Sequence, residues 1–490
     1  MPPNLYSSHH HHHIAAACCC ILLAALVFLA IFGPRHERIA DYRTLGELRV
    51  ATRLDALIYR TDESGQYAGF EHDLLVALGK RLGVPVRFIQ YPDTAHALEA
   101  LVNGQAHLAA AGLSRSSQLP LAWTAGLREI DFVLVGRAGG KRHTLRERDL
   151  AGRTVTVRER TKMAETLELL RQRIPGLKIV NPPPDTDDET LLMQTATGQI
   201  DLLAADRAHY AIANRYAPRL AVVYDLPFKS TVSWAMPLQD DNGLAREINV
   251  FLNESSENGF FASVADRYFG HIRRLDRYDI AFFQARIEKR LPRFLPYFRE
   301  AGARSGLDWR YLAALSYQES QWDPEATSYT GVRGLMMLTV DTANRLGVEN
   351  RLDPKQAVAA GARYLAMLQK KLAQDVPNPD RMWMTTAAYN IGLGGINNAR
   401  SLARKLGKNE NSWVEVKSVL PLLANPRYAN QFKTGPVRGG EALIMAENIR
   451  NFYDILRHTY PAERPVLAKP RQEPSSLGPR LSARAAPARL

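Results

Sequence analysis

Residues 307–339 read LDWRYLAALSYQESQWDPEATSYTGVRGLMMLT, and this stretch decides the architecture of the second half of the chain. Asp308 can cap a helix that carries Leu312 and Leu315 on one face. Glu319 follows Leu315 by four positions, so its side chain projects from the face that the leucines turn toward the core. The pattern therefore predicts a carboxyl group at the edge of an apolar core.

A carboxylate in such a place is costly unless it is paired or protonated. Desolvation by apolar neighbours raises the pKa of a carboxyl group, and a general acid that works near neutral pH needs this property. The alternative is a structural ion pair between Glu319 and an arginine such as Arg333 or Arg363. The helix by itself leaves both interpretations open.

Three motifs occur in order around this helix. They are QESQW at residues 318–322, GVRGLMMLT at residues 331–339 and AAYNIG at residues 387–392. Together they resemble the lysozyme-like lytic transglycosylases, and the resemblance covers residues 280–460. It implies an all-α domain that cleaves the glycan strands of peptidoglycan.

The same resemblance implies roles for individual residues. Glu319 is expected to be the catalytic acid–base, and Ser320 to help place the N-acetyl group of the substrate. Met337, Tyr389 and Asn390 are expected to line the sugar-binding cleft. A role for Tyr389 as an ordinary core aromatic residue stays open.

Two residues depart from the pattern of that family. Met337 stands where most of the wider family has Gln, and Met445 stands where an ETxxYV-type motif has Tyr. The second change removes a hydroxyl that could have hydrogen-bonded Glu319. We therefore expect the catalytic pKa and rate to differ from those of the family.

The number of carboxyl groups in the cleft bears on the mechanism, because ordinary glycosidases use two. Only Glu319 is placed by a motif, and Asp323, just before Pro324, is expected to cap or solvate the helix end. A single carboxyl suffices if it protonates the glycosidic oxygen and then takes a proton from the substrate's own C6 hydroxyl. The resemblance and the missing second acid together imply a lyase that leaves 1,6-anhydro-N-acetylmuramic acid ends.

Residues 45–270 alternate short apolar strands with amphipathic helices, which is typical of an α/β fold. The units fall into two halves and predict two similar lobes. The segments that carry the pattern are ELRVAT (47–52), GFEHDLLVALGKRLGV (69–84), VRFIQY (86–91), LEALVNGQAHLAAAG (98–112), GRTVTVRE (152–159), LLMQTATGQIDLLAAD (191–206) and NGFFASVADRYFG (258–270).

These segments resemble the extracellular solute-binding proteins of the amino-acid-binding type, with a cleft between two lobes. A ligand with a carboxylate and an amine needs an arginine and an acidic partner in that cleft. Arg115 and Asp206 are the candidates for this regulatory ligand site. A solvated surface position for Arg115 and a helix-capping role for Asp206 remain alternatives.

Lys and Arg number 63 against 50 Asp and Glu, and the net charge of +13 suggests an acidic partner such as an anionic lipid or wall polymer. The chain carries neither a zinc-finger spacing nor a phosphate-binding Gly-rich loop, so no nucleic acid, cofactor or metal is expected. Residues 14–33 form an uncharged apolar run that contains all three cysteines and is expected to be a membrane anchor or an uncleaved signal.

The predicted fold class is thus multidomain, α/β followed by all-α. We expect a signal or anchor (1–34), a solute-binding-like domain (45–270), a transglycosylase domain (280–460) and a disordered, basic, Pro-rich tail (461–490). The tandem layout resembles the membrane-bound lytic murein transglycosylases. That resemblance implies a periplasmic, membrane-associated enzyme of a Gram-negative-type envelope, attached to the outer membrane, whose first domain responds to a muropeptide or amino acid. A non-catalytic glycan sensor and a transporter component are the competing interpretations.

Overall fold

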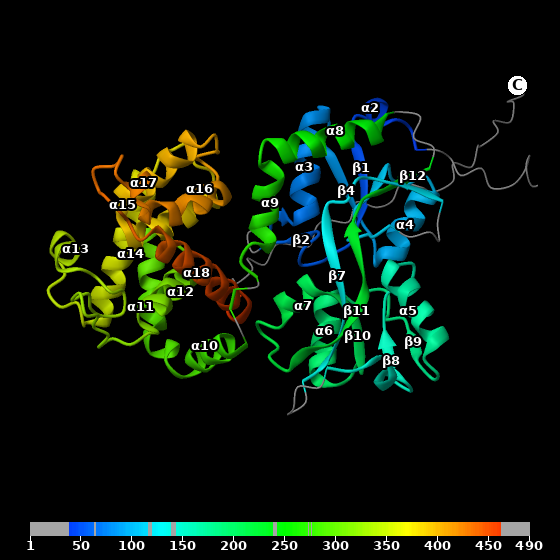
Figure 1. Cartoon of the computed structure of the whole chain (residues 1–490), viewed down its shortest axis with the longest axis horizontal. Coiled ribbons are helices and arrows are strands. Elements are labelled where there is room, and N and C mark those ends of the chain that lie inside the picture. The colour runs from blue at the N-terminus through cyan, green and yellow to red at the C-terminus, as the bar shows by residue number, and fades with distance from the viewer. Residues whose placement is uncertain are drawn as a thin grey trace, which may run out of the picture.

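The computed structural model describes residues 39–62, 65–115, 120–138, 144–238, 243–272, 274–275 and 277–461. The predicted anchor and nearly all of the predicted tail lie outside these residues. Within the described ranges, no helix combines the length and the apolar character that crossing a bilayer requires. Figure 1 shows an α/β part on the right and a helical part on the left, which agrees with the predicted order of fold classes.

The first lobe of the α/β part is built on a five-stranded sheet in the order β4-β1-β5-β12-β6. Strand β1 pairs in parallel with β4 and β5, and β12 runs antiparallel to β5 and β6. Its strands are β1 (Leu48–Thr52), β4 (Val86–Gln90), β5 (Leu108–Ala109), β6 (Leu121–Trp123) and β12 (Ala235–Pro237), with the small pair β2 (Arg60–Thr61) and β3 (Tyr67–Ala68). Its helices are α2 (Tyr42–Leu45), α3 (Phe70–Leu82), α4 (Thr94–Val102), α8 (Leu244–Glu257) and α9 (Phe260–Phe269).

The second lobe is inserted between β6 and β12, so the chain crosses twice between the lobes. Its sheet has the order β11-β7-β10-β8-β9. The strands are β7 (Arg128–Arg137), β8 (Thr154–Thr156), β9 (Lys178–Val180), β10 (Leu202–Asp206) and β11 (Leu220–Val232). The helices are η1 (Glu147–Leu150), α5 (Lys162–Arg173), α6 (Asp188–Thr197) and α7 (Arg207–Ala213).

Local sequence accounts for these boundaries. Leu74, Leu75 and Leu78 of α3 are buried, as their helical spacing predicts. Gly83 ends that helix in the left-handed conformation, and its N–H bonds to carbonyl groups of the last turn. Asp187 accepts a hydrogen bond from Thr190 N and so caps the start of α6. The predicted alternation of helices and strands is confirmed.

The helical part contains no strand longer than an isolated bridge among its described residues. Its helices are α10 (Arg277–Lys289), α11 (Leu291–Ser305), α12 (Trp309–Ser320), α13 (Val340–Arg345), α14 (Pro354–Lys371), α15 (Asp380–Lys405), α16 (Trp413–Val419), η2 (Leu420–Ala424), α17 (Pro426–Ala429) and α18 (Gly439–Thr459). Helix α12 packs against α11, α14 and α18, so the helix that carries Glu319 is the central one.

The two parts meet along α18, which borders the α/β part in Figure 1. Asp266 of α9 forms ion pairs with Lys417 of α16 and with Arg450 of α18, the latter at 3.0 Å. Arg450 also pairs with Glu447 at 3.1 Å, and Lys417 pairs with Glu447 at 3.2 Å. We call Asp266, Lys417, Glu447 and Arg450 the ionic junction. All its charges have partners, as buried charges require.

The second lobe holds the C-terminal half of α18. Arg215, which is buried, donates to the Asp454 carboxylate at 2.9 Å. The ring of Tyr216 stacks on the ring of His458, with centroids 3.6 Å apart, and His458 pairs with Glu189 at 3.5 Å. Both lobes therefore contact the helix that packs against α12.

Candidate active site

The catalytic candidate lies at the end of a well-defined helix. Asp308 caps α12 by accepting from Arg310 N at 2.9 Å, as predicted. The helix ends at Ser320, and both Gln321 and Trp322 then adopt left-handed backbone conformations, with φ of 53° and 56°. The Trp322 side chain is fully buried, and its Nε1 donates to Ala313 O at 2.9 Å. Glu319 is thus fixed by a capped start and an anchored end.

Glu319 is partly exposed as a residue, but its carboxyl group is desolvated by burial. Burial raises its pKa from an ordinary 4.5 to about 8. No hydrogen bond or ion pair reaches it from any described residue, so the alternative of a structural ion pair finds no support. Arg333 is exposed, and Arg363 donates to Leu346 O instead. At neutral pH the group is mostly protonated and can donate a proton.

The loop at residues 334–338 packs against the end of α12. Ser316 and Ser320 both donate to Leu335 O, at 2.9 and 3.0 Å, and Ser320 also donates to Ser316 O at 3.1 Å. The Ser320 hydroxyl therefore ties the helix to the loop. Gly334 has a φ of +79°, and a Cβ there would lie 1.9 Å from Arg351 O, so the glycine of GLMML cannot be replaced without a steric clash.

Tyr389 lies on α15 beside Glu319. Its hydroxyl donates to Met336 O at 2.7 Å. Its pKa lies well above the ordinary value, first because the ring is buried and second because the Glu319 carboxyl is near. Asn390 is exposed, and α15 is kinked at Gly392, whose φ of 73° and ψ of 164° suit only glycine. The structure thus brings Glu319, Ser320 and Tyr389 together around one loop.

The two methionines that depart from the family pattern occupy different surroundings. Met337 is half-buried and has a φ of 44°, which is unusual for a residue with a side chain. Met445 is buried in the core of the helical part. Asp323 accepts from Glu325 N at 3.1 Å and so caps the following turn, which agrees with its predicted structural role.

Backbone strain gathers at this site. The described residues other than glycine with positive φ are Arg160, Gln321, Trp322 and Met337. Gln321 and Trp322 follow the Glu319–Ser320 pair, and Met337 belongs to the loop that Ser320 contacts. Each such conformation costs of order 1–3 kcal/mol and persists only where the surroundings impose it. Strained backbone of this kind is concentrated at functional sites, which favours this region as the reaction centre.

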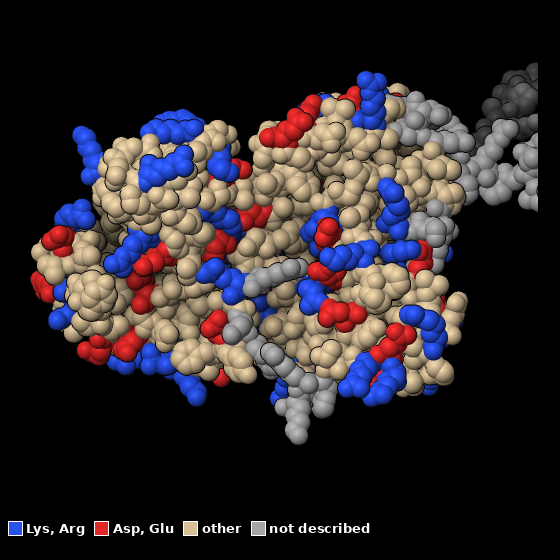
Figure 2. Space-filling view, viewed as in Figure 1, with Lys and Arg blue, Asp and Glu red and all other residues tan. Residues whose placement is uncertain are grey.

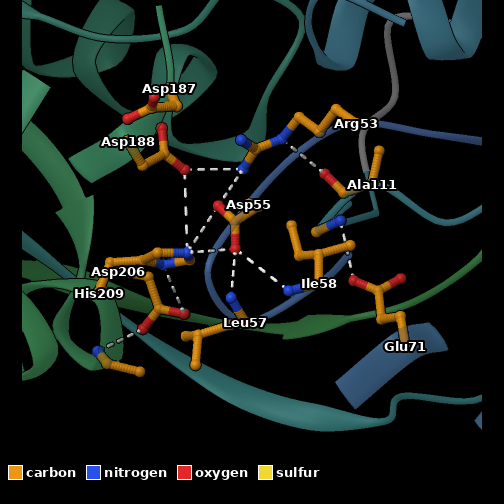
Figure 3. A network of polar contacts seen from close by, with 12 residues as sticks. Arg53, Asp55, Leu57, Ile58, Glu71, Ala111, Asp187, Asp188, Asp206 and His209 are labelled. Carbon is orange, nitrogen blue, oxygen red and sulfur yellow. Dashed lines mark hydrogen bonds and ion pairs between the residues drawn. The ribbon is translucent and has the colours of Figure 1, made fainter. Parts of the chain in front are cut away.

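A second candidate site is a cavity of ≈ 80 Å³ between the two lobes of the α/β part. Figure 3 shows its polar network. Arg53 lies 2.7 Å from Asp188 and 3.1 Å from Asp55, and His209 lies 2.9 Å from Asp55. Burial opposes the charge on His209, yet the neighbouring Asp55 raises its pKa to about 9. The lobes are therefore joined by charges of the chain itself.

Only one of the two residues predicted for this ligand site lines the cavity. Asp206 does so, but it also accepts from Ala208 N and pairs with Arg128, so the capping alternative holds as well. Arg115 is exposed and does not line the cavity.

Sequence reasoning missed most of the cavity's charged residues, which include Arg53, Glu71, Arg128, Arg158, Asp188 and His209. Arg53 could have been predicted from its place directly after β1, because residues at the carboxyl ends of strands line such clefts. Asp55, Asp188 and His209 are also close enough to hold a metal ion, but Arg53 already neutralises both carboxylates.

Two family models match the chain. Residues 48–271 match the bacterial extracellular solute-binding proteins of family 3, and residues 296–412 match the transglycosylase SLT domain. Among solved structures, a mutant of ArgBP from T. maritima aligns with a TM-score of 0.42 and 20% identity, over 47% of this chain and 97% of that one.

Relatives with both parts are similar over most of their length. The membrane-bound lytic murein transglycosylase F of Methylobacillus flagellatus is 37% identical over 87% of this chain and 91% of its own. The protein of the same name from Pseudomonas fluorescens is 39% identical over 84% of this chain and 85% of its own. The chain therefore belongs to the family of membrane-bound lytic murein transglycosylase F.

Proposed function

We propose that this chain is a lytic transglycosylase that cleaves the β-1,4 bond between N-acetylmuramic acid and N-acetylglucosamine in peptidoglycan, with Glu319 as the acid–base. The observation that carries this proposal is the Glu319 carboxyl group, which burial keeps protonated up to a pKa of about 8 and which has no partner among the described residues. A group of this kind is suited to donate a proton near neutral pH. Membership of the family supports the substrate and the reaction.

With Glu319 as the single catalytic carboxyl group, cleavage proceeds by an intramolecular transfer within the muramic acid unit. Glu319 donates its proton to the glycosidic oxygen as the bond to C1 of the muramic acid unit breaks. The resulting carboxylate then takes the proton of the C6 hydroxyl of the same sugar, and O6 bonds to C1. The proton returns to Glu319, water does not enter, and the product carries a 1,6-anhydro end. Asp323 caps a turn and is not assigned as a second catalytic carboxyl.

The neighbouring residues are given supporting roles in this proposal. The Ser320 hydroxyl oxygen keeps acceptor capacity beside its two donated contacts, and it can accept the N–H of the substrate's N-acetyl group. Tyr389 fixes the loop below Glu319 through Met336 O. Met337 and Asn390 are assigned to the walls of the sugar cleft.

The test is mass spectrometry of the products that the purified full chain releases from peptidoglycan. We expect muropeptides with 1,6-anhydromuramic acid ends and no reducing muramic acid ends. Reducing ends would mean that water is the nucleophile and that a second carboxyl group acts. No product at all would favour the alternative of a non-catalytic glycan-binding protein.

The proposed location of this protein is the cell envelope. Relatives are named as membrane-bound, and we propose that residues 45–270 and 280–460 form two periplasmic domains held at the outer membrane. The face in Figure 2 carries lysine, arginine, aspartate and glutamate side chains side by side. The excess positive charge of +13 is suited to an anionic wall or lipid surface.

We also propose that a muropeptide or amino acid in the interlobe cavity regulates cleavage. Asp188 pairs with Arg53 in the cavity, and the adjacent Glu189 pairs with His458 of α18. Opening the lobes would therefore disturb the helix that packs against α12. Adding soluble muropeptides should change the cleavage rate of the full chain, and an unchanged rate together with no heat of binding in calorimetry would contradict this regulation.

A further inference from the structure

One large side chain beside the catalytic loop is almost completely exposed. Tyr329 is 89% exposed, more than any other large hydrophobic residue that the structure describes. Single exposed apolar residues are common on protein surfaces and need a second observation before they indicate function. For Tyr329 that observation is the rigidity of the segment that presents it.

Tyr329 lies at the tip of a tight hairpin. Ser328 N donates to Val332 O at 3.0 Å, and Gly331 N donates to Ser328 O at the same distance. The Ser328 hydroxyl accepts from Val332 N at 3.2 Å and shares a hydrogen bond with Thr330. Four hydrogen bonds thus close the turn internally. The tyrosine is therefore held out into solvent by an ordered support.

The base of this hairpin belongs to the backbone that sets the catalytic loop. Arg333 forms bridges with Thr327 on one side and with Leu338 on the other. Arg351 donates to Gly331 O at 2.8 Å and to Leu338 O at 2.9 Å, so one side chain ties the hairpin tip to the loop. Because that loop also receives the hydroxyl of Ser320, Tyr329 is rigidly connected to the region of Glu319.

The Tyr329 ring is not covered by neighbouring side chains. Arg438, at the start of α18, is near enough to the Tyr329 side chain for the latter to raise its pKa. Arg438 also lies 3.6 Å from Glu441, which balances its charge. Among the described residues, no ring stacks on Tyr329 and no cation lies over it. Both faces of the Tyr329 ring are therefore open to solvent.

We propose that Tyr329 is a sugar-stacking platform for a saccharide unit of the glycan strand outside the pair that is cleaved. An aromatic ring has an electron-rich face, and the C–H groups of a pyranose ring present a weakly positive, apolar face. Tyrosine gives a large rigid contact with little loss of side-chain entropy. This inference rests on the proposed function, and it adds that the enzyme binds long glycan strands more tightly than short ones.

The test is the dependence of cleavage on strand length, measured with the full chain on soluble, uncrosslinked glycan strands fractionated by length. For Tyr329→Ala we expect the KM for long strands to rise about tenfold with kcat little changed, which corresponds to about 1.4 kcal/mol. The shortest cleavable strands should be processed as by the wild type. Tyr329→Phe and Tyr329→Trp should stay within about twofold on long strands, because both keep the ring.

Tyr278→Ala is the matched control, since Tyr278 is 74% exposed but lies on α10, and it should behave as the wild type. A KM of Tyr329→Ala that equals the wild-type value at every length would overturn the platform while leaving the proposed function intact. An equal rise at every length would also overturn it. Failure of the wild type to release anhydro ends would instead overturn the proposed function.

Discussion

Replacing Glu319 by Gln is expected to lower kcat for the release of anhydro ends by about a thousandfold or more. General acid–base catalysis contributes about 10²–10⁴-fold, and here one group supplies both the proton donation and the proton abstraction. Glutamine has nearly the same shape and can do neither. The fold should be unaffected, because the Glu319 carboxyl has no hydrogen bond or ion pair to lose among the described residues. Product release followed by mass spectrometry and chromatography measures the effect.

Asp323→Asn is the matched control for this variant, and it should retain activity within about twofold because Asp323 only caps a turn.

The pH profile of the wild type is a second test of Glu319 as the acid. Since the acid must be protonated and burial raises its pKa to about 8, kcat/KM should fall about tenfold per pH unit above about 8. Equal losses in both variants, or a break near the ordinary 4.5, would contradict the role of Glu319.

Much of the fold could be predicted because local rules and tertiary packing agree. The leucines of α3 share one face, Gly83 stops the helix, and Asp308 caps α12 as expected. Asp353 caps α14 in the same way. The two-lobed α/β part and the all-α part follow from such segments. What local patterns do not contain is the pairing of distant strands. Strand β12 returns to the first sheet because of long-range packing, and no residue spacing in the sequence predicts this pairing.

The candidate site was predictable where a motif carries the chemistry. Glu319 and Tyr389 belong to motifs and lie near one another in the structure. The residues of the interlobe cavity could not be predicted in this way. Its Arg53–Asp188 pair joins residues that are 135 positions apart, and neither residue stands in a motif. Arg115 was predicted as the arginine that a ligand carboxylate needs, but the exposure of a side chain depends on which distant segments fold over it, and Arg115 is exposed.

The ionic junction between the two parts gives the second large expected effect. Arg450→Met should lower the free energy of unfolding of the helical part by about 3–5 kcal/mol. Arg450 is 2% exposed and neutralises Asp266 and Glu447, so its loss leaves two buried carboxylates with Lys417 as their shared cation. Methionine keeps most of the apolar length of the side chain, so the loss reports the charge rather than a cavity. Urea unfolding followed by circular dichroism measures it.

Arg304→Met is the control, because Arg304 is exposed and lies 3.7 Å from Glu300 on the surface of α11. Surface pairs of this kind contribute about 0–1 kcal/mol, so its unfolding midpoint should barely move. Adding Glu447→Gln to Arg450→Met should recover part of the loss, since one of the two stranded charges is then removed. A double variant that is as unstable as the sum of both single variants would mean that the carboxylates are not coupled through Arg450. The junction would then owe its stability to apolar packing between α9 and α16 rather than to charge.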